Sequence, residues 1–158
     1  MKDATTTLRQ LEAYVQEEIG AQGRLLAALE AQDAALRSHE PERIAHATGA
    51  LDAELEAQGN RAHKRRQLLE SLASIWGVAA SSLTLTSIAE RAGDDGERLA
   101  RQRHELERVT RRVQRLARRN TTIARFHQRL TADVLQALLV QDEGVQVSDG
   151  GALVDAEA

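Results

Sequence analysis

The stretch LARQRHELERVTRRVQRLARRNTTIARFHQRLTADVLQA, residues 99–137, decides the fold of this chain. Within it, one set of positions recurs at steps of three and four without a skip, which makes a heptad seam about five repeats long. The seam positions are Leu99, Gln102, Leu106, Val109, Val113, Leu116, Asn120, Ile123, His127, Leu130, Val134 and Ala137. This spacing predicts a helix from about Glu97 to Val140, roughly 65 Å long at 1.5 Å per residue. Such a helix needs a partner along its seam, because intrinsic propensity alone does not hold it.

Two earlier runs at the same spacing are the expected partner. The first run begins near Thr7 and ends at Ser38-His39-Glu40-Pro41. Proline disfavours α conformation in the residue before it and suits the first turn of a new helix. We therefore expect a tight turn and a second helix, antiparallel to the first, from Pro41 to Trp76.

The middle of the second helix is unusually polar. Gln58 and Arg65 stand on its inward stripe, where leucine would be expected, and Gly59 falls at the same place. A glycine inside a helix costs about 1 kcal/mol relative to alanine. The sequence therefore does not decide whether the second helix is continuous or is broken near Gly59.

A short helix is expected between the second and third long ones. Gly77 ends the second helix, and residues 78–86 are predicted to form a connector. Ser87-Ile88-Ala89-Glu90 fits the capping-box pattern of Ser or Thr followed three residues later by Glu. The short helix should stop at Gly93-Asp94-Asp95-Gly96. The predicted fold class is all-α: an antiparallel, coiled-coil-like bundle of three long helices and one short connecting helix.

Length and composition agree with one helical domain. The chain has 158 residues, no cysteine and only 2% aromatic residues, so a disulfide scaffold and an aromatic-rich β-sandwich are excluded. We expect a single domain over residues 1–140 and a flexible, acidic tail over residues 141–158, which contain no basic residue. The N-terminus lacks the apolar run of a secretory signal, and no apolar run could span a membrane, so a cytoplasmic location is expected.

Charge is distributed unevenly along the chain. Residues 1–60 hold 5 basic and 11 acidic side chains, whereas residues 98–130 hold 11 arginines and two glutamates. An arginine-rich helix can bind nucleic acid. Here the arginines spread around the helix, and almost no aromatic side chain is available to stack on a base. We therefore expect the basic helix to be balanced by the acidic first helix and consider nucleic-acid binding unlikely.

No catalytic, metal-binding or cofactor-binding site is predicted. The histidines are His39, His46, His63, His104 and His127, and no two of them stand three or four residues apart as helical metal ligands would. No glycine-rich loop lies between a strand and a helix to hold phosphate. We therefore expect a protein that is not an enzyme.

The end of the third long helix carries more apolar residues than its seam requires. Phe126 lies beside the seam, and apolar residues at 135 and 138–140 widen the strip. Apolar area without a partner in the chain could bind an amphipathic helix of another protein. Self-association, or packing on the turn at Pro41, would cover it equally well.

Three stretches resemble one known family. They are Leu25-Leu26-Ala27-Ala28-Leu29-Glu30, the region from Arg65-Arg66-Gln67-Leu68-Leu69 through Ile75-Trp76-Gly77-Val78 to Thr84–Glu90, and Leu116-Ala117-Arg118-Arg119-Asn120-Thr121-Thr122-Ile123. In order and spacing, over about residues 8–140, the chain resembles the FlgN-like flagellar export chaperones.

This resemblance implies a chaperone without ATPase activity or cofactor. It would bind the C-terminal amphipathic helix of the hook–filament junction (hook-associated) proteins, prevent their premature assembly and dock on gate or ATPase components of the type III export apparatus. Carried onto this sequence, the client-binding residues would be Ile123, Phe126, Leu130, Val134 and Leu138. The alternative is a structural coiled-coil protein that forms a homodimer through the third long helix, with Asn120 setting the register.

Overall fold

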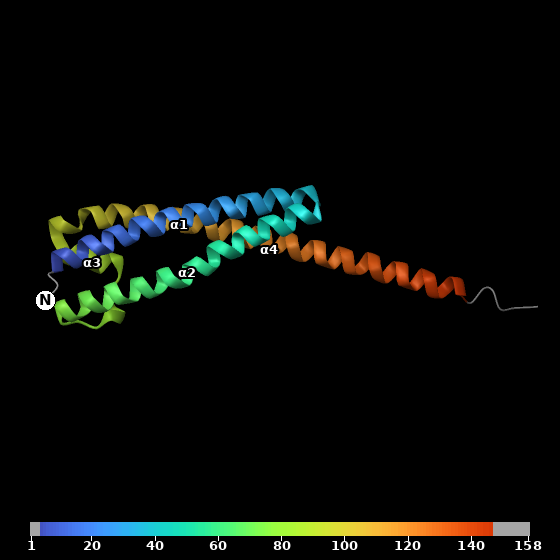
Figure 1. Ribbon diagram of the computed structural model, residues 1–158. Helices are drawn as coiled ribbons and strands as arrows, with labels where there is room; N and C mark the ends of the chain where they lie inside the picture. The colour runs from blue at the N-terminus through green and yellow to red at the C-terminus, as the bar shows by residue number, and fades with distance from the viewer. Residues whose placement is uncertain (1–3, 147–158) are drawn as a thin grey trace, which may run out of the picture. The chain divides into compact units, whose positions relative to one another are not determined.

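The computed structural model describes residues 4–146, and the side chains of residues 4–138. Four α-helices form this part of the chain, joined by two short 3₁₀ turns, and no strand occurs in it (Figure 1). The helices are α1 (Ala4–Ser38), α2 (Pro41–Trp76), α3 (Leu85–Ala92) and α4 (Glu97–Gln146), and the 3₁₀ turns are η1 (Ala80–Ser82) and η2 (Gly93–Gly96). The prediction of an all-α fold is confirmed.

The chain divides into two compact units, residues 1–120 and 121–158. The first unit holds α1, α2, α3 and the first part of α4, and the described part of the second unit is the remainder of α4. Helix α4 continues to Gln146, past the end predicted near Val140, because no proline interrupts residues 141–146. The single domain over residues 1–140 stays a prediction. So does the flexible acidic tail, since residues 147–158 lie outside the described part.

Helices α1 and α2 form a hairpin around the turn that the sequence predicts. Glu40 is the N-cap of α2, with Pro41 in the first turn, and the Ile44 amide donates to the Glu40 carbonyl over 3.0 Å. The Ser38 hydroxyl donates to the Ala35 carbonyl, closing the end of α1. Helix α2 is continuous through Gly59, so the break that the sequence left open does not occur.

Ion pairs between α1 and α2 show the register of the hairpin. Glu17 pairs with Lys64 and Glu18 with Arg61, with N···O distances of 2.7 and 3.0 Å. Further along α1, Arg24 pairs with Glu54 over 3.2 Å. Residue numbers rise along α1 as they fall along α2, so the two helices run in opposite directions.

The cap of α3 differs from the one that the sequence predicts. The N-cap is Thr84, whose side chain accepts from the Ser87 amide over 3.1 Å, while the Ser87 hydroxyl accepts from the Thr84 amide over 2.9 Å. Ser87 is thus the third residue of the capping box, and the predicted Ser87–Glu90 box is wrong. Helix α3 therefore begins at Leu85, earlier than a cap at Ser87 would allow, and ends before Gly93. Its buried residues are Ile88 and Ala89.

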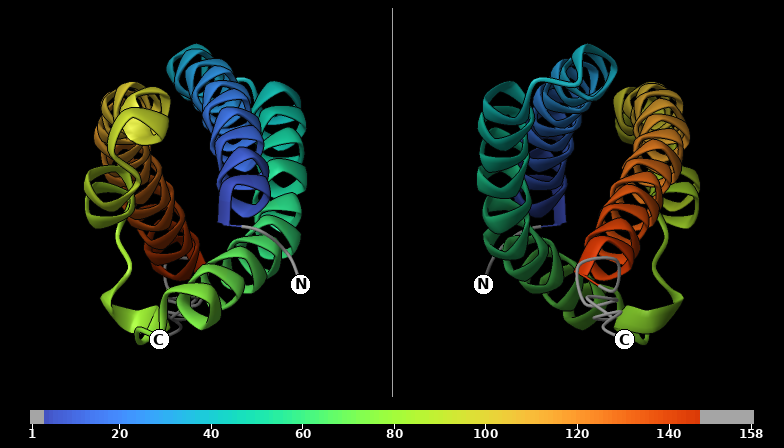
Figure 2. Two further views of the ribbon diagram at one scale, coloured as in Figure 1. Left: turned by 90° about the vertical axis from the view of Figure 1, so that its left-hand side faces the viewer. Right: turned by 90° about the vertical axis from the view of Figure 1, so that its right-hand side faces the viewer.

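The main core of the first unit draws at least one fully buried side chain from each helix. They include Leu11 of α1, Leu72 of α2, Ile88 of α3 and Leu99 of α4, none more than 1% exposed. A second cluster joins Leu25, Leu26 and Leu29 of α1 to Val113 of α4. In the end views of Figure 2, α1 lies between α2 and the first part of α4.

Two buried amides of the α4 seam tie α4 to the backbone of α1. Gln102 Nε2 donates to the Glu12 carbonyl over 3.2 Å, and Asn120 Nδ2 donates to the Leu29 carbonyl over 2.9 Å. The order of these contacts shows that α1 and α4 run in the same direction. Each amide fixes one register, because a shift of α4 would leave a buried polar group without its acceptor.

The core assignment leads to a prediction about two leucines of α2. Leu72→Ala should lower the free energy of unfolding by about 2–5 kcal/mol, because a fully buried leucine leaves a cavity. Leu55, which is 46% exposed on the same helix, is the matched control, and Leu55→Ala should cost no more than about 0.5 kcal/mol. Urea denaturation followed by the fluorescence of Trp76, the only tryptophan, measures both. Equal losses in the two variants would contradict the assignment.

Candidate functional site

Most of the exposed large apolar side chains in the described chain lie on α4 in the second unit. Phe126, Leu130, Val134, Leu135 and Leu138 are 50–63% exposed. Four of these five belong to the client-binding set that the sequence predicts. We call Phe126, Leu130, Val134 and Leu138 the apolar strip. Their spacing of four residues places them along one side of the helix. Ile123, the fifth predicted residue, is half-buried.

The strip continues a seam that is buried earlier on the same helix. Leu99 is 1% exposed and Val113 8%, and Asn120 is 3% exposed where it meets α1. The heptad pattern runs on from there without a change, but Leu130 and Val134 are half-exposed. An exposed apolar strip of this length is typical of a surface that binds another molecule.

Acidic side chains of α1 pair with the arginines of α4 in the first unit. Glu12 lies 4.0 Å from Arg98, and Glu30 lies 3.6 Å from Arg112. The closest of these pairs joins Asp33 to Arg119, with an N···O distance of 2.6 Å. These pairs put part of the positive charge of α4 against its own neighbour, as expected for a basic helix balanced by an acidic one.

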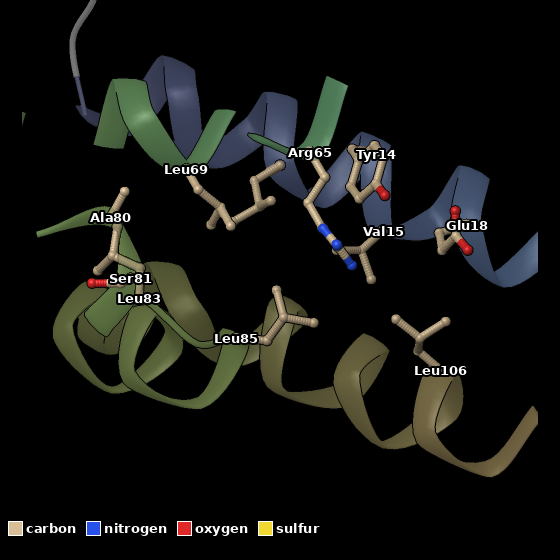
Figure 3. Close-up of a pocket in the computed structure, with 11 residues that line it drawn as sticks. Tyr14, Val15, Glu18, Arg65, Leu69, Ala80, Ser81, Leu83, Leu85 and Leu106 are labelled. Carbon is tan, nitrogen blue, oxygen red and sulfur yellow. The ribbon is translucent and has the colours of Figure 1, made fainter. Parts of the chain in front are cut away.

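A cavity of about 420 Å³ opens in the first unit between α1, α2, the connector and α4 (Figure 3). Most of its wall is apolar, and Tyr14, Glu18 and Arg65 are its main polar residues. The apolar lining is Leu11, Val15, Leu69, Ala80, Leu83, Leu85 and Leu106, and Ser81 completes the wall. The sequence analysis missed this cavity, because the connector residues that close it lie far from α1 along the chain.

Tyr14 stands in the wall of the cavity and is only 5% exposed. Burial raises the pKa of the Tyr14 phenol above 10, and the negative charge of Glu18 raises it further. The nearby guanidinium groups of Arg65 and Arg61 act in the opposite direction. The phenol is therefore neutral at physiological pH and can donate a hydrogen bond.

The described residues show no arrangement suited to metal chemistry. They contain no cluster of three or more histidine, aspartate or glutamate side chains that could hold a metal ion. Within the same part of the chain, no helix combines the length and hydropathy that a membrane span requires.

Comparison with known proteins identifies the family. The model of the family described as "FlgN protein" matches residues 1–147. The chain belongs to the FlgN family. No curated protein and no solved structure matches it significantly. Membership of the FlgN family indicates a general role as a flagellar export chaperone, and the family is not one of enzymes.

Tyr14, the only tyrosine of this FlgN-family chain, gives a prediction about pH. Because its pKa is raised in the folded state, the folded protein keeps the phenolic proton at a pH where the unfolded chain loses it. Stability should therefore fall as the pH rises above about 10, and Tyr14→Phe should remove this part of the fall. Tyrosinate absorbance and urea denaturation at several alkaline pH values measure the two effects. Identical pH profiles for the two proteins would contradict the assignment.

Proposed function

We propose that this protein is a cytoplasmic type III export chaperone that binds the C-terminal amphipathic helix of hook-associated flagellar proteins through the apolar strip of α4. By covering that helix it prevents premature assembly, and it delivers the client to gate or ATPase components of the export apparatus. The observation that carries the proposal is the exposure of Phe126, Leu130 and Val134, each at least half-exposed, on a chain of the FlgN family.

The physics of the strip suits a helical client. An amphipathic helix places apolar side chains at the same spacing of three and four residues, so two such strips can interdigitate. Each Å² of apolar surface removed from water contributes about 25 cal/mol. Phe126, Leu130 and Leu138 are the largest side chains of the strip and would contribute most of this burial. Binding by burial alone is reversible and needs no catalytic group.

A structural coiled coil is the second candidate function. The apolar strip would also suit α4 of a second copy, which would make the chain a homodimeric scaffold. One observation disfavours part of this alternative: the Asn120 amide, which would set the register of a dimer, donates within the chain to Leu29 and Gln32. Sedimentation distinguishes the two functions, since a scaffold dimer separates only on unfolding, whereas a chaperone exchanges its client.

The client-binding proposal predicts the effect of charge in the strip. The double variant Leu130→Asp and Val134→Asp should abolish co-purification with the hook-associated proteins of the same organism, because two carboxylates would be buried without partners. Both positions are exposed, so the thermal unfolding midpoint should stay within a few degrees of the parent value.

Leu55→Asp is the matched control for this experiment. Leu55 is 46% exposed on α2 and lies outside the strip, so this variant should keep its client. Client binding by the strip variant at the parent level would refute the site. Loss of binding in both variants would mean that the effect is not specific to α4.

A further inference from the structure

Arg65 lies on α2 beside two basic residues that form ion pairs, but Arg65 itself forms none in the described part of the chain. On α2, Arg61 pairs with Glu18 over 3.0 Å and Lys64 pairs with Glu17 over 2.7 Å. Glu18 also accepts from Gln22, so both of its oxygens are used. Within the described part of the chain, Arg65 takes part in no ion pair or hydrogen bond. Glu17 and Glu18 of α1 are therefore already paired with other residues of α2 and α1.

The Arg65 side chain extends into the cavity instead. Figure 3 shows its guanidinium pointing from α2 toward the space bordered by Val15, Leu85 and Leu106. Arg65 is exposed, so water completes the hydrogen bonds of its guanidinium, and an anion bound in the cavity would take the place of that water. Glu18 is the one carboxylate in the described lining of the cavity, and its two oxygens already accept from Gln22 and Arg61.

A second donor faces the same cavity. The Tyr14 hydroxyl makes no hydrogen bond to any described residue, although the side chain is 95% buried, and its raised pKa keeps its proton in place. A guanidinium and a phenol together are two donors of the kind that hold a carboxylate, and the leucines around them would hold an apolar group. The volume of about 420 Å³ lies in the range of small-ligand cavities.

We propose that this cavity is a second binding site, which takes a carboxylate carried by an apolar peptide segment of a partner protein. Arg65 binds the carboxylate, Tyr14 donates a second hydrogen bond to it, and an adjoining leucine-like side chain fills the apolar part. A peptide is the expected occupant because the partners of this family are proteins. The site lies wholly in the first unit and uses no residue of the apolar strip.

The first experiment compares N-acetyl-leucyl-leucine with its C-terminal amide on the full chain. The acid should bind and the amide should bind at least about ten-fold more weakly, because the amide offers no charge to Arg65. Tyrosinate absorbance reports the site directly, since Tyr14 is the only tyrosine. The bound acid should raise the pKa of Tyr14 further. Equal binding of acid and amide, or no binding of either, would overturn the proposal.

Variants of neighbouring arginines give the matched control. Arg65→Met keeps the alkyl stem but removes the charge, and it should weaken binding of the acid about ten-fold, so that about ten times more acid is needed for the same change at Tyr14. Arg66→Met alters the adjacent exposed residue, which does not line the cavity, and should change neither. Equal effects of the two variants would overturn the proposal. Both residues are exposed, so thermal unfolding should confirm that each variant is folded.

Two further measurements test the source of the carboxylate and the independence of the cavity from the apolar strip. Decanoate represents a free fatty acid as the source of the carboxylate, and its binding without binding of the peptide acid would overturn the peptide assignment. The strip variant Leu130→Asp and Val134→Asp should bind the peptide acid as the parent does. If that variant lost the peptide acid as well, the cavity would not be an independent site.

Discussion

The parallel pairing of α1 with α4 is the interaction on which the rest of the structure depends. Gln102 and Asn120 donate to backbone carbonyls of α1, and Leu25, Leu26 and Leu29 of α1 pack with Val113. Helix α1 has 35 residues and α4 has 50, while the heptad seam of α4 continues to Ala137. In the second unit the seam positions Leu130 and Val134 are half-exposed. The exposed strip thus continues one heptad pattern and needs no special motif.

The ion pairs between the helices also centre on α1. Helix α1 provides the acids for both of its neighbours: Glu17 and Glu18 pair with α2, while Glu30 and Asp33 pair with α4. The buried pair of Glu18 with Arg61 is the most enclosed of these, with side chains 12% and 10% exposed. Arg65 pairs with none of these acids, and its guanidinium points toward the cavity.

Much of the fold could be predicted because helical periodicity is a local signal. The turn at Pro41 and the stripe of α1 follow from residue type and spacing alone. The cap of α3 could not be chosen correctly, since Thr84 and Ser87 both suit an N-cap and burial of Ile88 decides between them. The cavity could not be predicted either, because Tyr14 and Leu106 are distant in sequence and meet only through packing.

The shape of the strip bears on how a chaperone of this kind would release its client. A helix that contacts one exposed helix face buries less area than a standard interface of about 1,600 Å². If the strip binds the client as proposed, affinity would depend on a few anchors such as Phe126, and competition for those anchors would displace the client. A deep groove would bind more tightly but would hold the client against export. A strip on one exposed face of a helix would therefore suit reversible escort better than permanent assembly.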